Sequence, residues 1–174
     1  MIMSISLEIY GLVAICATAM VITRPIAVHA LLYLVTALLA LACVFDVLGA
    51  PFAAVLEVII YAGAIIVLFV FVVMMVNLGQ PDELREKGWL SAGTWTGPSI
   101  LALLLLSTMI YALWHGTAPA NGPANGPAMG PIGPQEVGLS LYGPYILTVE
   151  LSSFLLLAGL VSAYHIGRRI GEKN

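Results

Sequence analysis

Charged side chains are scarce in this sequence. Only 9% of its 174 residues are Asp, Glu, Lys or Arg, whereas 61% are hydrophobic. A soluble domain carries roughly 25% charged residues, so this chain has too few charges to cover the surface of a globule in water. The formal net charge of −3 provides no basic face for phosphates and argues against a nucleic-acid partner. Most of the chain must therefore be solvated by the lipid bilayer.

Cysteine and histidine are also rare, which limits the chemistry that the chain can perform. Cys16 and Cys43 form no CxxC motif, and on two helices at different depths they are not expected to form a disulfide. The histidines, His29, His115 and His165, fall at the ends of apolar stretches, and we expect no metal there. The sequence has no nucleotide-binding loop, catalytic triad or metal cluster, which argues against a stand-alone enzyme.

Long apolar stretches, in contrast, are abundant. A membrane-spanning helix needs about 20 mainly apolar residues. Prolines at Pro25 and Pro51 separate the first three stretches, because proline disfavours helix just before itself and is tolerated at a helix start. The predicted spans are Ile5–Thr23, Ile26–Leu48, Phe52–Asn77, Pro98–Trp114 and Tyr145–Ile166. The sequence therefore predicts an all-α integral membrane protein, a single membrane domain with five transmembrane helices.

The basic residues predict the orientation of these helices. Lys and Arg are retained on the cytoplasmic side of bacterial membranes, and with five spans all six basic residues fall on one side. They lie in the first loop, the third loop and the C-terminal tail: Arg24, Arg85, Lys87, Arg168, Arg169 and Lys173. We therefore expect the N-terminus outside and the C-terminus inside the cell.

Two of the loops have a recognisable composition. Residues 80–88 begin with proline, continue with acids and end with glycine, which indicates one short surface helix. Residues 116–144 contain Pro-Ala-Asn-Gly twice, with prolines recurring every fourth residue from Pro119 to Pro131. Such uncharged, low-complexity sequence has little to bury, so we expect an extended or disordered outer loop.

Carboxylates within the spans identify candidate functional positions, because charged groups are costly in a bilayer. Glu8 and Asp46 are close enough to the outer interface to reach water. Glu57 lies about 7 Å inside the outer end of the third span, and Glu150 lies at a similar depth in the fifth. For this deeper pair the sequence leaves two interpretations open. They take part either in helix packing and partner contacts or in a hydrated proton path.

The third span has the most unusual local sequence. Glu57 and Tyr61, four residues apart, are expected on one face of the helix. The small residues Ala62, Gly63 and Ala64 follow directly, and such residues allow close helix packing in membranes. Glycine also weakens a helix interior. The segment therefore fits either plain packing or a hinge or π-bulge.

The same span closely resembles the signature of a known family. The run Leu56–Met75, LEVIIYAGAIIVLFVFVVMM, resembles the J subunits of bacterial NADH-quinone oxidoreductase, or respiratory complex I. Pro25–Leu34 (PIAVHALLYL), Leu141–Tyr145 (LYGPY) and Val149–Leu151 with the later Leu155–Leu157 are similar to the same family. The likeness covers nearly the whole chain except the Pro-Ala-Asn-Gly loop.

This resemblance implies a non-catalytic subunit of a proton-translocating complex in the bacterial inner membrane. FMN, iron–sulfur clusters, NADH and quinone would be bound by other subunits, and the neighbours would be the A, H, K and N types. The third helix would couple quinone reduction to proton translocation through a π-bulge around Tyr61–Gly63. Val67 and Phe69 would border a water path. Glu57 lies within the signature, and Glu150 joins it as a candidate.

Two other functions remain open from the sequence. The chain could be a small subunit of a related cation/proton antiporter or membrane-bound hydrogenase, since these complexes share similar membrane subunits. It could also be a structural membrane scaffold with no part in ion movement. Glu57 beside the Tyr-Ala-Gly stretch favours a subunit of complex I, or of a related antiporter or hydrogenase complex, over the structural scaffold.

Overall fold

The computed structural model describes residues 2–24, 27–76, 92–114 and 131–171, and these residues are nearly all helical. Within this part of the chain, five helices are long and apolar enough to cross a membrane. They are Ile5–Thr23, Ala27–Val47, Pro51–Met75, Trp95–Trp114 and Ile146–Arg168. The predicted all-α fold with five transmembrane helices is confirmed. The structure divides into two compact units, Met1–Ile132 and Gly133–Asn174.

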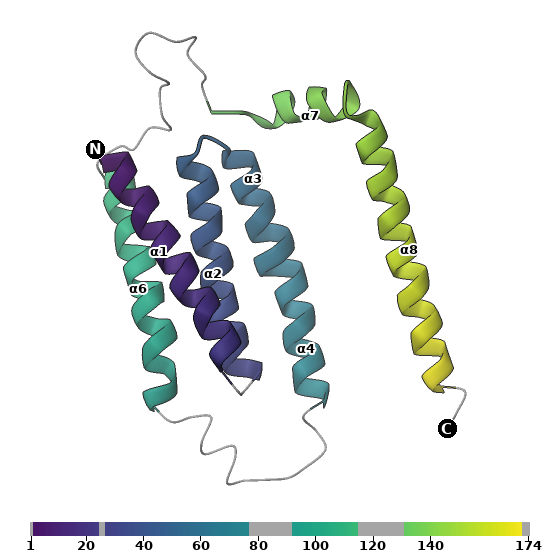
Figure 1. Cartoon of the computed structure of the whole chain (residues 1–174), viewed down its shortest axis with the longest axis horizontal. Coiled ribbons are helices and arrows are strands. Elements are labelled where there is room, and N and C mark those ends of the chain that lie inside the picture. The colour runs from purple at the N-terminus through teal and green to yellow at the C-terminus, as the bar shows by residue number, and fades with distance from the viewer. Residues whose placement is uncertain (1, 25–26, 77–91, 115–130, 172–174) are drawn as a thin grey trace. The chain divides into compact units, whose positions relative to one another are not determined.

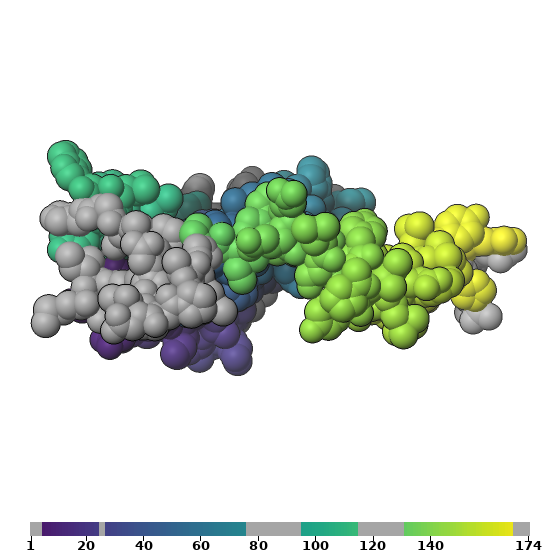
Figure 2. All heavy atoms as spheres, turned by 90° about the horizontal axis from the view of Figure 1, so that it is seen from above, coloured from purple at the N-terminus to yellow at the C-terminus, as the bar shows by residue number. Residues whose placement is uncertain are grey.

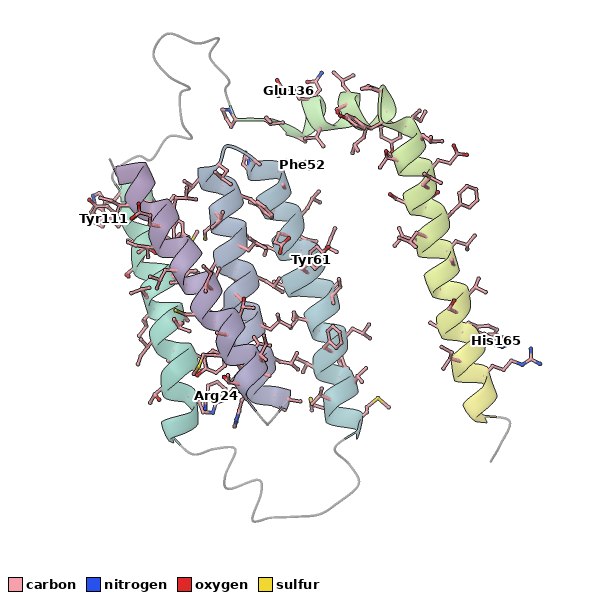
Figure 3. The ribbon with its side chains drawn as sticks, viewed as in Figure 1. Arg24, Phe52, Tyr61, Tyr111, Glu136 and His165 are labelled. Atoms are coloured by element: carbon pink, nitrogen blue, oxygen red, sulfur yellow. The ribbon has the colours of Figure 1, made fainter. Side chains whose placement is uncertain are left out.

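The first unit contains four of the spans, packed side by side (Figure 1). Its elements are α1 (Ile2–Thr23), α2 (Ala27–Val47), α3 (Pro51–Leu56), η1 (Glu57–Ile65), α4 (Ile66–Val76) and α6 (Ala92–Trp114). Successive spans run in opposite directions, and α2 contacts each of the other three. Arg24 consequently lies at the opposite end of this unit from Phe52 and Tyr111 (Figure 3).

The core of this unit lies between α1, α2 and α6. Its buried side chains are Tyr10 and Val13 of α1, Ala40 and Val47 of α2, and Leu105 of α6. Alanine at the centre of α2 lets the helix backbones approach closely, as small residues do in membrane helices. The cysteines are free thiols on α1 and α2, as predicted.

A tight turn joins α2 to α3. Gly49 has φ +85°, a left-handed conformation that glycine adopts without steric cost. The Ala50 N–H donates to the Phe45 carbonyl at 3.0 Å, which closes the end of α2 as a glycine C-cap does. Pro51 then occupies the first turn of α3. The boundary predicted from Gly49-Ala50-Pro51 is therefore present, with α2 and α3 running antiparallel.

The fourth span begins earlier than predicted. α6 starts at Ala92 and contains Pro98 in its interior, whereas the sequence pointed to Pro98 as the first residue. A proline there removes a single backbone N–H donor, and membrane helices tolerate this when neighbouring groups compensate. Pro98 is itself buried, so the helix around it is packed against the rest of the unit.

The second unit consists of α7 (Pro134–Tyr142) and α8 (Ile146–Gly171). Figure 2 shows them as one continuous row of green to yellow atoms. The expected extended loop over 116–144 is therefore wrong for residues 134–142. Pro134 in the first turn and Glu136 near the helix N-terminus favour helix there. The segment 80–88, the repeats from Pro119 to Pro127, and His115 lie outside the described residues.

A glycine forms the corner between these two helices. Gly143 has φ −103° and ψ −106°, and a Cβ at this position would lie 2.7 Å from the Leu139 carbonyl oxygen. Real Cβ atoms essentially never approach an atom so closely. The glycine in the Leu-Tyr-Gly-Pro-Tyr run is therefore required by the shape of the backbone. It lets α7 end at Tyr142 and α8 begin at Ile146, with three residues between them.

Candidate functional site: the third membrane span

The third span contains a π-helical segment, η1, between two α-helical ones. At its start, the Glu57 N–H donates to the carbonyls of Ala53 and Ala54. At its end, the Ile66 N–H donates to the carbonyls of Gly63 and Tyr61 and so bypasses that of Ala62, its α-helical acceptor. The ladder has therefore shifted from an acceptor four residues back to one five residues back. π-Helical winding is rare and occurs often at functional sites.

Gly63 is accommodated within this altered ladder. A Cβ at position 63 would lie 3.3 Å from the Val58 carbonyl oxygen. That separation is tighter than nine in ten real Cβ contacts, so Val58 would have to shift if residue 63 were alanine. The nine-residue π segment encloses Tyr61–Gly63, the stretch at which the family resemblance implies a π-bulge.

The two polar side chains of η1 differ in their surroundings. Glu57 is only 9% exposed, whereas Tyr61 is 50% exposed. η1 packs against α2, so the carboxylate lies within the protein while much of the phenol faces outward from this unit. The expectation that both share one face holds for an ideal α-helix, but their burial separates them here. Tyr61 lies between the two ends of the span (Figure 3).

Val67 and Phe69 lie beyond the π segment, in the first turn of α4. Both are exposed, whereas the preceding residue, Ile66, is buried. The residues of α4 that follow the π segment thus present an open apolar surface in this chain. Such a surface must be covered by lipid or by a neighbouring membrane protein.

The other predicted acidic residues occupy different places. Glu8 on α1 and Asp46 on α2 are exposed near the ends of their helices, which agrees with access to water. Glu150 belongs to the second unit, near the start of α8, where its side chain is exposed. Among the described residues, no group of three His, Cys, Asp or Glu side chains could hold a metal ion.

Sequence reasoning missed a cluster at the other end of the first unit. Tyr33 is 1% exposed, and a Cβ on Gly97 of α6 would overlap its hydroxyl and lie 3.1 Å from its Cζ. Arg24 lies over the ring of Tyr33, with Cζ 5.4 Å from the centroid. His29 lies in the first turn of α2, at the end of the span as predicted, and its side chain is buried. No local sequence pattern predicts the contact between residues 33 and 97, because it forms only when α2 packs on α6.

The fold and site together define a class: a multi-pass membrane protein with a π-helical third span. Comparison with known proteins makes this specific. Residues 17–166 match the family model described as NADH-ubiquinone/plastoquinone oxidoreductase chain 6. The chain is 54% identical over 157 residues to NADH-quinone oxidoreductase subunit J of Pseudomonas aeruginosa, covering 90% of this chain and 92% of that protein.

Two further relatives agree with this assignment. NADH-quinone oxidoreductase subunit J of Escherichia coli strain K12 is 51% identical over 172 residues, covering 98% of this chain and 90% of that protein. NADH-quinone oxidoreductase subunit J of Buchnera aphidicola subsp. Schizaphis graminum is 48% identical over 158 residues, covering 91% of this chain and 93% of that protein. The chain belongs to the NADH-quinone oxidoreductase subunit J family.

Proposed function

We propose that this chain is a membrane-arm subunit of a proton-pumping NADH:quinone oxidoreductase in the bacterial inner membrane. Its third span would couple quinone reduction to proton translocation by changing between π-helical and α-helical forms. The observation that carries this proposal is the π-helical segment Glu57–Ile65 within a chain of the subunit J family. The relatives' names favour complex I over an antiporter or hydrogenase assembly.

The proposed role needs no cofactor on this chain. FMN, the iron–sulfur clusters, NADH and quinone would be bound by other subunits, and the A, H, K and N types would be membrane neighbours. The open surfaces of α4 and α8 fit such a subunit. No residue of the α8 span is buried within the described structure, and an exposed Glu150 on such a helix calls for protein or water beside it.

A change of winding would have a defined mechanical effect. An α-helix turns about 100° and rises about 1.5 Å per residue. Moving the hydrogen-bond ladder by one residue would therefore rotate α4 relative to α3 by about 100° and shift it by about 1.5 Å. Val67 and Phe69 would then turn away from the neighbour that they face, and other side chains of α4 would take their place. Such a rotation could open or close a water path without moving α3.

The side chains of η1 supply the chemistry of the proposed path. Tyr61 carries a hydroxyl in the middle of the span, where the ladder bypasses the Ala62 carbonyl. Water could bridge these groups when the segment is π-helical. Glu57 is the buried acid at the start of the segment, and Glu150 is a second membrane carboxylate. Both can accept or release a proton, which apolar neighbours cannot.

The testing experiment uses Gly63→Leu in the assembled complex. Both forms of the span must lie within a few kcal/mol of each other for turnover to interconvert them. Leucine favours the α form and crowds the Val58 carbonyl in the π form. We expect normal amounts of assembled complex with weakened quinone reduction and proton pumping, measured in inverted membrane vesicles.

The alternative outcomes separate the competing interpretations. Loss of assembly without a change in the activity per assembled complex would assign Gly63 to helix packing alone. Normal assembly, electron transfer and pumping would remove the conformational role from this chain. Gly11→Ala serves as the control, because a Cβ at Gly11 meets no atom within 4 Å and α1 contains no π segment.

A further inference from the structure

Arg24 has an unusual environment for a residue that directly follows a membrane span. Its Nη2 donates to the Tyr33 hydroxyl at 3.4 Å, and its guanidinium lies over the Tyr33 ring. No carboxylate pairs with it among the described residues. A guanidinium has five N–H donors, and among the described residues the hydrogen bond to Tyr33 uses one of them. Arg24 itself is exposed.

The ring beneath Arg24 is held rigidly. Tyr33 is fully buried in α2, and its hydroxyl end fits into the space left by the missing side chain of Gly97. A side chain so confined has few alternative rotamers. The guanidinium resting on it is therefore oriented before any ligand arrives, which reduces the entropy cost of binding.

Arg24 lies at the end of the unit where α1 and α4 end and where α2 and α6 begin. Because two positive and two negative helix dipole ends meet here, the positive charge among the described residues of this region comes from Arg24 itself. The acids of the described first unit, Glu8, Asp46 and Glu57, belong to the opposite half. Ile22, two residues before Arg24, and Trp95, two residues before Gly97, are both exposed, and tryptophan is enriched at membrane interfaces.

We propose that Arg24, oriented by Tyr33, binds the phosphate of an anionic phospholipid at this end of the bundle. Guanidinium donors match phosphate oxygens in geometry and charge. Because α1 ends at Thr23, the guanidinium lies at headgroup depth, while Ile22 offers contact to an acyl chain. This position favours a lipid phosphate over a soluble one. The inference does not depend on the coupling role of η1.

The test is photocrosslinking of the purified, assembled complex in detergent. The probe is phosphatidylglycerol with a diazirine near the glycerol end of one acyl chain, and labelled peptides are identified by mass spectrometry. We expect labelling near Ile22 and Trp95. Arg24→Gln should reduce it about fivefold, since one basic residue at a membrane surface contributes roughly that factor. Arg24→Lys should retain part of the labelling, because it keeps the charge without the planar fork.

The control is Arg168→Gln, which removes an exposed arginine near the end of α8 that lies over no aromatic ring within the described residues. It should leave labelling near Ile22 unchanged. A matching phosphatidylcholine probe should label wild type only as weakly as phosphatidylglycerol labels Arg24→Gln, and this comparison still applies if Arg24→Gln fails to assemble.

Three results would overturn the proposal. Equal labelling of wild type by the two lipids would show that charge is not recognised. Full displacement of the probe by millimolar inorganic phosphate would assign the site to soluble phosphate. Release of a neighbouring subunit by Arg24→Glu, with no lipid labelling in wild type, would show that a protein carboxylate occupies the position instead.

Discussion

Gly63 of η1 and Gly97 of α6 both leave room for a neighbouring atom, but the neighbour differs. At Gly63 it is the Val58 carbonyl of the same helix, 3.3 Å from the position that a Cβ would take. At Gly97 it is the Tyr33 ring of another helix. The first glycine therefore influences how one helix winds, and the second determines how closely two helices pack. Small residues in membrane spans serve both purposes, and only the contacts tell them apart.

The two spans also show that proline does not explain the π segment. α6 contains Pro98 in its interior and remains α-helical. The span that contains η1 has its proline only in the first turn of α3, yet its ladder shifts several residues later. β-Branched Val58, Ile59 and Ile60, which are poorer helix formers than alanine or leucine, precede Gly63 in this segment. The shift therefore accompanies weak local propensity rather than a missing donor.

Gly97→Ala should have the largest effect. Tyr33 is buried and cannot swing away, so the added methyl group must separate α2 from α6. Overpacking of this kind costs up to about 3 kcal/mol. We expect a lower temperature of thermal dissociation and less assembled complex, measured by native gel electrophoresis of heated membranes.

A second substitution sharpens this prediction. Tyr33→Phe removes the hydroxyl that the new methyl group would overlap, so the double variant should recover part of the loss. No recovery would mean that the space beside Gly97 is not set by Tyr33. Tyr33→Phe also removes the hydrogen bond that Arg24 donates to the hydroxyl. The single Tyr33→Phe variant is therefore measured beside the double variant.

Gly143→Ala should have an intermediate effect. Its Cβ would meet the Leu139 carbonyl at 2.7 Å, and forcing the corner to relax costs about 2 kcal/mol, in the range for local backbone strain. Reduced amounts of assembled complex are expected. Gly138→Ala, in the same unit with no atom within 4 Å, is the matched control. Equal behaviour of the two variants would remove the steric requirement at the corner.

Gly63→Ala should have the smallest effect on stability. A methyl group at this position would crowd the Val58 carbonyl in the π form, and a cost of about 1 kcal/mol would shift a π–α equilibrium about fivefold toward α. Hydrogen exchange of the amides in 57–65 within the assembled complex should show increased protection. Gly11→Ala should stabilise α1 without altering exchange in η1. Unchanged exchange in Gly63→Ala would indicate that η1 does not visit an α form.

The sequence predicted most of the fold, because its signals were local. Length and hydropathy identified five spans, and glycine and proline placed the turn at Gly49–Pro51. The start of α6 was misplaced, since Pro98 resembles a helix start wherever the preceding residues are weakly apolar. α7 was missed because the proline-rich repeats ahead of it dominate the composition of its loop.

The candidate site was predicted less completely. The residues of η1 were chosen from the family resemblance and from the acid and glycine in the span, and their roles remain proposals. Burial could not be predicted, because an acid four residues from a tyrosine gives no sign of which one faces α2. The cluster of Arg24, Tyr33 and Gly97 brings together residues far apart in sequence, which periodicity alone does not pair.

The short turn at Gly49 has a consequence for biogenesis. With only a few residues between them, α2 and α3 must enter the bilayer together as a helical hairpin during synthesis. η1 continues directly from α3 and packs against α2. The Glu57 carboxylate would therefore meet lipid with its covering helix already beside it, and insertion would not expose an isolated acid to acyl chains. Lengthening this turn would therefore impair the membrane insertion of α2 and α3 before it affected any step of turnover.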